Sequence, residues 1–256
     1  MSERIFLAGA TGAIGRILVP LLVRAGHTVY GTTRRADNSA MLEKLGAIPV
    51  VVDVFDRDAL ADAMSDAAPS VVIHQLTDLP PGLDPQRMAE ATARNARIRT
   101  EGTRNLVDTA LAAGCGRMIA QSIAWAYAPG EPPLTETHPF DLDATGARRT
   151  SVDGVIALER AVLETPGLDG TVLRYGQLYG PGTGIPVAGG ASPLHVEAAA
   201  WAAALALEHG VSGAFNVAED GAAVSSAKAR RAFHWTPDLR LPQDVAHILE
   251  QTRGAQ

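Results

Sequence analysis

Three glycines near the amino terminus, Gly9, Gly12 and Gly15, have a spacing that could hold a phosphate-bearing ligand. They follow the apolar run IFLAG and precede the amphipathic stretch IGRILVPLLVRAG, so they fall between an expected strand and an expected helix. In such a turn the first glycine permits the bend, the second lets the backbone approach a pyrophosphate, and the third lets the helix pack closely on the strand. The spacing therefore predicts a dinucleotide-binding turn, with an ordinary glycine-rich loop as the alternative.

Two arginines at the end of the next apolar run bear on which dinucleotide would bind. NAD-binding turns usually have an acidic residue ~20 residues further on, at the end of the second strand, where it bonds the ribose hydroxyls. The run YGTTRR has Thr33 at that place, followed by Arg34 and Arg35. A guanidinium can bind a 2′-phosphate with two charge-assisted hydrogen bonds, whereas a carboxylate would repel it. The sequence favours NADP(H) over NAD(H), unless both arginines simply solvate a surface loop.

Asp53, in the segment VVVDVFD, is a further candidate contact to the dinucleotide. Its carboxylate ends an expected third strand, from which it could meet the amino group of adenine. It could equally cap the helix that is expected to begin near Arg57, because aspartate is a favoured N-cap residue.

These residues can meet only if strands and helices alternate along the chain, and the apolar pattern predicts this. Strands are expected at residues 5–9, 28–33, 48–54, 70–76 and 117–122, separated by helices at 14–25, 40–45, 57–66 and 85–113. Such alternation implies right-handed crossovers and a parallel sheet covered on both faces. Later segments predict a helix over 152–163, strands at 171–180 and 213–220, and a short capped helix before Pro237.

Composition excludes several classes of protein. The chain has 256 residues with 46% hydrophobic content, which is enough to bury a substantial core. A net charge of −6 and a pI near 5.6 argue against binding to nucleic acid. No stretch approaches the ~20 apolar residues of a membrane helix, and the start does not have the pattern of a signal peptide. The single cysteine, Cys115, suits a reducing compartment, and no His, Cys or acid spacing predicts a metal site. A cytoplasmic location is expected.

Several segments together carry a resemblance to a known family. They are the turn GATGAIG, VVVDVFD, the fourth-strand segment VVIHQLT, EGTRNLVDTALAAG with RMIAQSIAWAYAPG, LRYGQLYGPGT and SAKARRAFHWTP. The chain resembles the extended short-chain dehydrogenase/reductase family, which includes NAD-dependent epimerases and dehydratases. The resemblance implies a single α/β unit over residues 1–256, a Rossmann-like doubly wound parallel sheet with a small C-terminal substrate-binding lobe. Its core would comprise mainly residues 1–165, 171–180 and 213–218, and its lobe about 181–212 and 219–256.

The resemblance also implies which residues contact the nicotinamide cofactor. They lie in the glycine turn, at the ends of the second and third strands, and just after the fourth strand. They are Gly9, Thr11, Gly12, Ala13, Ile14, Gly15, Thr33, Arg34, Arg35, Asp53, Val54, Gln75 and Leu76.

The helix after the long loop departs from the family pattern. The family opens this helix with Tyr-x-x-x-Lys, in which the tyrosine is the acid/base and the lysine lowers its pKa and binds the nicotinamide ribose. Here the helix reads TSVDGVIALERAVLE, and alignment through Glu159 puts Ser151 and Val155 at the two places. Without a nearby cation, a phenol keeps a pKa of about 10 and is a poor base at neutral pH. The usual catalytic pair is missing.

Three other residues are candidates for the catalytic role. Ser122 ends the fifth strand, where the family places a substrate-binding hydroxyl, although the aligned position could equally be Ile123. Tyr127 lies five residues further along, and Tyr175 occupies a place that lies beside the nicotinamide in the family. Each phenol could instead be a core residue with its hydroxyl bonded. His74, in the fourth strand, is interpreted as a core residue, with an acid/base role beside the nicotinamide as the alternative.

Four arginines lie in the long helix expected before the fifth strand: Arg94, Arg97, Arg99 and Arg104. Their spacing puts Arg97 and Arg104 on one face of the helix, with Arg94 beside it. The simplest interpretation is that these arginines form a row on the solvent-exposed side of the helix. Alternatively some enter the active cleft, because Arg99 stands where the family has an asparagine and Asn95 lies one turn earlier. They could also pair with acids at a subunit contact, since the resemblance implies a homodimer through this helix and the one after the long loop.

These features predict an NADP(H)-dependent oxidoreductase of the extended short-chain type that acts on a small carbonyl or alcohol substrate. Two alternatives stay open. A nucleotide-sugar epimerase or dehydratase fits the resemblance, although the expected lobe is short for such large substrates. A non-catalytic NADP(H)-binding sensor or regulator would explain the loss of the tyrosine and lysine, because a fold does not guarantee chemistry.

Overall fold

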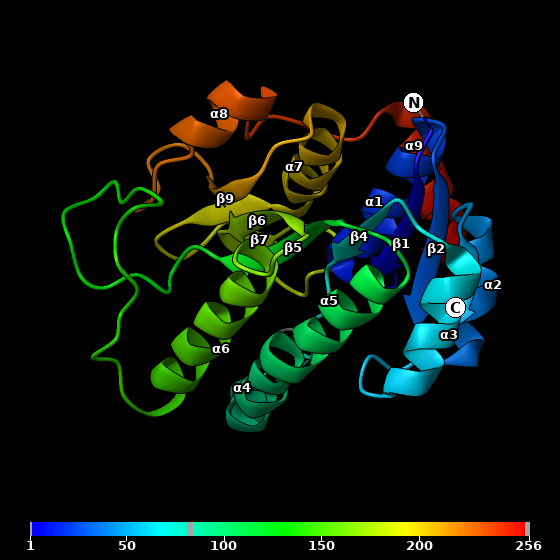
Figure 1. Cartoon of the computed structure of the whole chain (residues 1–256). Helices are drawn as coiled ribbons and strands as arrows, with labels where there is room; N and C mark the ends of the chain where they lie inside the picture. The colour runs from blue at the N-terminus through cyan, green and yellow to red at the C-terminus, as the bar shows by residue number, and fades with distance from the viewer. Residues whose placement is uncertain (1, 81–83, 254–256) are drawn as a thin grey trace.

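A seven-stranded parallel sheet forms the centre of the molecule in the computed structural model, which describes residues 2–80 and 84–253 (Figure 1). The strand order is β3-β2-β1-β4-β5-β6-β9, and every neighbouring pair is parallel. The order reverses between β1 and β4, and ligands of such sheets bind outside the carboxyl ends of the strands at this point. The strands are β1 (Arg4–Ala8), β2 (Thr28–Thr33), β3 (Ile48–Val51), β4 (Val71–His74), β5 (Arg117–Ile123), β6 (Asp169–Tyr175) and β9 (Gly213–Val217).

Helices cover both faces of this sheet, which confirms the predicted doubly wound α/β fold. One face carries α1 (Ala13–Arg24), α2 (Ser39–Lys44), α7 (Val196–His209), α8 (Ala227–Phe233) and α9 (Gln243–Arg253). The other carries α3 (Arg57–Ala67), α5 (Thr103–Ala112) and α6 (Gly146–Leu163), with α4 (Met88–Arg97) packed against α6. Each face buries its own apolar cluster, because the strands are apolar on both sides.

The expected helix over residues 85–113 is not uniform. A 3-10 turn at Pro85–Arg87 leads into α4, a π-helical turn at Ile98–Gly102 follows, and α5 comes last. These segments form one continuous helical rod over residues 85–112. A π turn inserts one extra residue and rotates everything before it relative to everything after it. Arg97 and Arg104 therefore do not keep the common face that regular α-helical spacing predicts.

The expected strand over residues 171–180 is two strands in two sheets. The break falls at Gly176, where an added Cβ would lie 2.1 Å from the carbonyl oxygen of Ser192. This close approach lets the chain leave β6 and pair β7 (Gln177–Tyr179) with β8 (Pro193–His195) in a separate parallel sheet. The third strand is shorter than expected and ends at Val51.

One C-terminal helix lies on the main sheet. Residues 181–212, which the resemblance places in the lobe, include α7, and α7 packs against α1. Its buried face is built from alanines, which allow two helices to approach closely, and these are Ala198, Ala199, Ala202, Ala203 and Ala206. The segment that remains beside the sheet is the β7–β8 pair with its connection. Residue 1 and residues 254–256, the ends of the predicted unit, lie outside the described residues.

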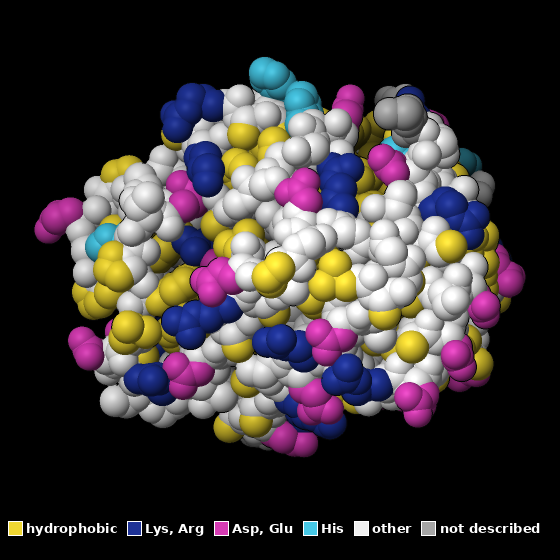
Figure 2. Space-filling view, in the orientation of Figure 1, with side chains coloured by type: hydrophobic (Ala, Val, Ile, Leu, Met, Phe, Trp, Pro, Cys, Tyr) yellow, Lys and Arg dark blue, Asp and Glu magenta, His cyan; other side chains and the backbone are white. Residues whose placement is uncertain are grey.

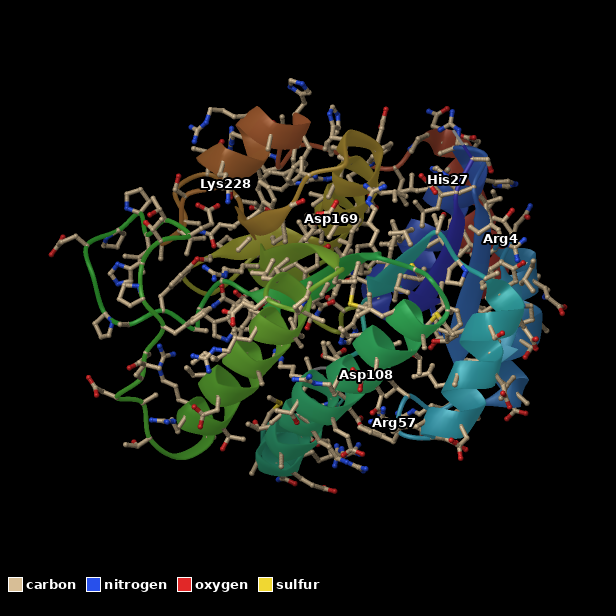
Figure 3. All side chains as sticks on the ribbon, viewed as in Figure 1. Arg4, His27, Arg57, Asp108, Asp169 and Lys228 are labelled. Atoms are coloured by element: carbon tan, nitrogen blue, oxygen red, sulfur yellow. The ribbon has the colours of Figure 1, made fainter. Side chains whose placement is uncertain are left out.

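Charged side chains of both signs are mixed over the outer helices (Figure 2). Pairs four residues apart join Glu90 to Arg94, Arg97 to Glu101 and Arg149 to Asp153. Arg57 of α3 donates a hydrogen bond of 3.1 Å to Asp108 of α5, tying neighbouring helices together (Figure 3). Within the described chain, none of the helices combines the length and apolarity needed to cross a membrane.

Candidate functional site

The glycine turn after β1 leaves no room for side chains. Gly9 has φ +91°, and an added Cβ would lie 2.6 Å from backbone atoms of Gln75. A Cβ on Gly15 would lie 2.2 Å from the carbonyl oxygen of Gly9, so the turn and the first helical turn are in direct backbone contact. Gly12 caps α1 and has no side-chain oxygen to occupy the first N–H groups of the helix. These groups and the positive end of the helix dipole are suited to a phosphate.

A cavity of about 120 Å³ lies above this turn, at the carboxyl ends of β1, β2 and β4. Apolar side chains of Phe6, Phe55 and Leu60 form part of its wall. The predicted cofactor residues that line it are Gly9, Thr11, Gly12, Thr33, Arg34, Asp53, Val54, Gln75 and Leu76. Ala13 and Ile14 line the neighbouring larger cleft, whereas Gly15 and Arg35 are not among the lining residues of either cavity.

The end of β2 carries polar side chains beside the smaller cavity. The Thr33 hydroxyl accepts hydrogen bonds from the Arg35 N–H and from the Asn38 side chain, each at 3.1 Å, so it organises the turn. Arg34 lines both cavities, and its nearest carboxylate, Asp78, is 4.0 Å away. Arg35 lies 3.7 Å from Asp37.

Asp53 lines the smaller cavity and does not cap α3. Its carboxylate accepts a hydrogen bond of 3.0 Å from the Phe55 N–H. The N-cap of α3 is Asp56, whose side chain accepts from the Ala59 N–H at 3.1 Å. Of the two interpretations offered for Asp53, the helix cap is wrong.

A cleft of about 770 Å³ continues from the smaller cavity and shares Gly12, Arg34, Gln75 and Thr77 with it. Its walls combine apolar side chains with a few polar groups, as small-molecule sites usually do. The apolar members include Leu79, Pro80, Ile123, Trp125, Leu178 and Ile185, and the polar members include Thr92, Asn95, Arg99, Ser122, Ser151, Tyr175 and Gln177. Sequence reasoning missed Thr92, Trp125 and Gln177 as cleft residues, since no local pattern distinguishes them.

The positions of the family's catalytic pair lie on the first half of α6. Ser151 faces the cleft. Val155 is fully buried, in an apolar cluster with Ile123 and Val152. The Val155 side chain is too short to reach the cleft and carries no charge, so this position supplies no cation to the site.

Ser122 and Tyr127 belong to one buried polar network. The Ser122 hydroxyl donates to Glu159 at 2.7 Å, and Glu159 forms an ion pair of 2.6 Å with Arg174. Arg174 also donates to the Tyr127 hydroxyl, which in turn donates to Asn216, each at 2.7 Å. Burial raises the pKa of Tyr127, and the charge of Arg174 opposes part of the shift. Ser122 still lines the cleft, whereas Tyr127 is not among its lining residues.

Tyr175 is the predicted phenol that faces the cleft. Its hydroxyl is buried, and neither it nor the two polar atoms of the Gln75 side chain has a hydrogen-bond partner among the described residues. Burial raises the pKa of Tyr175 well above its ordinary value, and the neighbouring Gln75 side chain offsets part of the rise. The phenol therefore stays protonated at neutral pH and can act as a donor but not as a base.

His74 is a core residue, as interpreted. One ring nitrogen lies 3.1 Å from the Thr103 hydroxyl and the other accepts from the Leu76 N–H at 3.2 Å. Burial, aided by the nearby charge of Arg99, lowers the pKa of His74 to about 4. The ring is neutral at physiological pH.

The four arginines of the long helix have separate environments. Arg94 lies 2.6 Å from Glu90 and 3.2 Å from Asp78, and Arg97 pairs with Glu101 while lying over the Phe55 ring. Arg104 is exposed. Arg99 lines the cleft, as its alignment with the family's asparagine hinted.

The site fits a nicotinamide dinucleotide. The backbone cradle at Gly9 and Gly15 has no room for any side chain, and the first N–H groups of α1 open towards it. The buried amide of Gln75 has no partner among the described residues and lies where both cavities meet. Such an unpaired amide is costly unless a ligand supplies the missing hydrogen bonds. The residues around the smaller cavity would hold the adenosine and pyrophosphate, and Gln75 and Tyr175 would face the nicotinamide end.

Comparisons with known proteins agree with this geometry. A model of the NAD dependent epimerase/dehydratase family matches residues 5–224. A Streptomyces protein named 3-diazoavenalumate denitrifying reductase is 42% identical over 98% of this chain and 91% of its own length. The structure of Thermus thermophilus UDP-glucose 4-epimerase with NAD superposes with a TM-score of 0.73 at 19% identity, covering 98% of this chain and 99% of that one. The UDP-glucose 4-epimerase of Thermotoga maritima with UDP-glucose gives 0.74 at 18% identity, covering 98% of each chain.

Proposed function

The chain belongs to the NAD dependent epimerase/dehydratase family, and we propose that it is a nicotinamide-dependent reductase that removes the diazo group of a small aromatic substrate. The family membership confirms the resemblance of the glycine turn and the later segments. The reductase activity is supported by the Streptomyces relative at 42% identity, whose name specifies a diazo-bearing substrate and a denitrifying reduction.

The observation that carries the proposal is the composition of the cleft where the family has its tyrosine and lysine. Ser151 lies there instead of the phenol, and the buried Val155 replaces the ammonium. Epimerisation and carbonyl reduction both require a proton to move on or off a substrate oxygen. A cleft without this pair suits a reaction in which no such proton transfer is needed.

Reductive loss of a diazo group is a reaction of that kind. A bound reduced nicotinamide would supply a hydride. In the net change the hydride pair forms a new C–H bond at the ring carbon, the C–N bond breaks, and its electron pair leaves with the neutral molecule N₂. No alkoxide develops; where the ring carries an ortho-hydroxyl, the product leaves as a phenolate, which takes its proton from water because phenols have a pKa of about 10. The chain's own residues then need only bind the two reactants, exclude water and hold the ring carbon near the hydride.

We propose NADP(H) as the preferred cofactor, because Thr33 replaces the ribose-binding acid and Arg34 lines both cavities. Replacing Arg34 with alanine should weaken NADPH binding about 10-fold or more, the usual contribution of a charge-assisted hydrogen bond, and should change NADH binding little. Fluorescence titration of both nucleotides measures both affinities.

Arg35→Ala, which removes the pair with Asp37 instead, is the matched control. Equal losses for NADPH and NADH in Arg34→Ala would contradict the assignment; the solved neighbour from Thermus holds NAD, so both must be tested.

A second candidate, reduction of a carbonyl, is favoured by the Tyr175 hydroxyl, which lies in the cleft without a partner among the described residues. The two candidates differ in their need for that hydroxyl. Wild type and Tyr175→Phe should both turn over an ortho-diazophenol such as 3-diazo-4-hydroxycinnamate, with rates within about 3-fold, because the phenolate product can take its proton from water and does not need a protein acid. NADPH consumption and N₂ release report this activity.

The same enzymes are then given aldehydes, ketones and quinones. Carbonyl turnover that falls about 100-fold or more in Tyr175→Phe would favour the second candidate and assign the acid. Absence of turnover with every compound, together with tight NADPH binding, would support the sensor interpretation instead. NADPH-independent interconversion of sugar nucleotides would support an epimerase.

A further inference from the structure

Arg99 is a partly buried cation in the wall of the cleft, and among the described residues its charge has no counter-ion. No carboxylate of the described residues lies within 4.0 Å of its guanidinium, and none of the undescribed residues has an acidic side chain. Arg94 and Arg97, on the same rod, are both paired with carboxylates. A partly buried charge without a protein partner is available to a bound anion, and this geometry points to a ligand group of opposite charge at Arg99.

Two local features direct Arg99 into the cleft. It belongs to the π-helical turn Ile98–Gly102, and such turns are frequent at functional sites because they re-aim a side chain. On the facing helix α6, Gly154 lies against α4 and the arginine stem, since an added Cβ there would lie 3.3 Å from Ala96 Cα and 3.4 Å from Arg99 Cδ. The side chain therefore crosses between α4 and α6 and does not point outward as Arg104 does.

The charge of Arg99 persists at neutral pH. Burial lowers the pKa of Arg99 to about 10, which still leaves the guanidinium protonated. The neighbouring His74 is neutral, so it neither neutralises nor competes with the arginine.

The surroundings of Arg99 indicate the kind of ligand. Asn95, Ser122 and Ser151 add polar groups to the same cleft, and Trp125 and Ile123 add apolar and aromatic surface. The phosphates of a dinucleotide would bind elsewhere, at the glycine turn, and Arg99 is not among the residues that line that smaller cavity. A flat apolar body with one anionic end matches this combination.

We propose that Arg99 binds the carboxylate of an aromatic acid and thereby selects anionic substrates over neutral ones. This inference rests on the proposed function, because it concerns the substrate part of the same cleft. The guanidinium presents two parallel N–H groups to a carboxylate, an arrangement that lysine cannot reproduce.

Calorimetry of the NADPH-saturated protein tests the assignment without turnover. The probes are 4-hydroxycinnamate and its methyl ester, which differ by one negative charge. Wild type should bind the acid about 10- to 100-fold more tightly than the ester, as expected for charge-assisted hydrogen bonds. Arg99→Met should bind both alike, and Arg99→Lys should retain part of the preference. Arg104→Met, which removes an exposed guanidinium from the same rod, should behave as wild type.

Three outcomes would overturn the assignment. They are an acid-to-ester ratio near one in wild type, an unchanged ratio in Arg99→Met, and a loss of NADPH affinity in Arg99→Met with the ratio preserved, which would assign Arg99 to the cofactor. If Arg99→Met fails to fold, the wild-type ratio and Arg99→Lys still decide. Preference for the acid in a protein that does not reduce diazophenols would leave the carboxylate assignment standing and refute only the diazo chemistry.

Discussion

Replacing Gly15 with alanine is expected to abolish cofactor binding, with NADPH affinity falling about 100-fold or more. The added methyl would lie 2.2 Å from the carbonyl oxygen of Gly9 and 2.7 Å from backbone atoms of Ala10. Backbone atoms cannot turn aside as a flexible side chain can, so α1 has to move away from the glycine turn. Over-packing of this kind costs about 1–3 kcal/mol, and it moves the N–H groups that would hold the pyrophosphate.

Fluorescence titration with NADPH measures the loss, and thermal unfolding shows whether the variant is folded. Gly26→Ala is the matched control, because Gly26 lies just after α1 and a Cβ there meets nothing within 4 Å. Its φ of +89° means that this control should cost about 1 kcal/mol of stability while leaving NADPH affinity unchanged. If Gly15→Ala folds and binds NADPH with wild-type affinity, the glycine turn is not the pyrophosphate-binding site.

Glu159→Ala is expected to destabilise the fold by about 3–5 kcal/mol, the usual cost of leaving one member of a buried ion pair alone. Both side chains of the Glu159–Arg174 pair are 6% exposed or less. Burial alone would lower the pKa of Arg174, but the hydrogen bonds and charge of Glu159 raise it above its ordinary value. Without Glu159 the guanidinium stays charged, buried and poorly compensated, and the Ser122 hydroxyl loses its acceptor.

Urea denaturation measures this loss. The double variant Glu159→Leu with Arg174→Met removes both charges, and it should recover most of the stability, because apolar residues of similar volume often replace a buried pair at little cost. A loss below about 1 kcal/mol in Glu159→Ala would show that the pair contributes no more than a surface salt bridge does.

The glycine turn and the order of the strands and helices around it could be predicted from local sequence. The glycine spacing, the run YGTTRR and the alternation of apolar runs with helical segments each depend on residues close together in the chain, and each predicted its element within a few residues. The cleft was not readable in this way. Tyr127 and Tyr175 are the same residue type near the ends of neighbouring strands, yet the first joins the network around Arg174 and the second faces the cleft.

The sequence by itself determined the parallel sheet, the nucleotide turn and the absence of the family's tyrosine and lysine, because period, spacing and residue identity are properties of the chain. Only the tertiary structure decided that Arg99 enters the cleft while Arg97 lies over Phe55, because the π turn between α4 and α5 and the space beside Gly154 both arise from packing. It likewise decided that α7 covers the main sheet, since alanines become a helix contact only when α1 lies opposite them. Local pattern sets which elements form, and contacts between distant segments set which side chains meet.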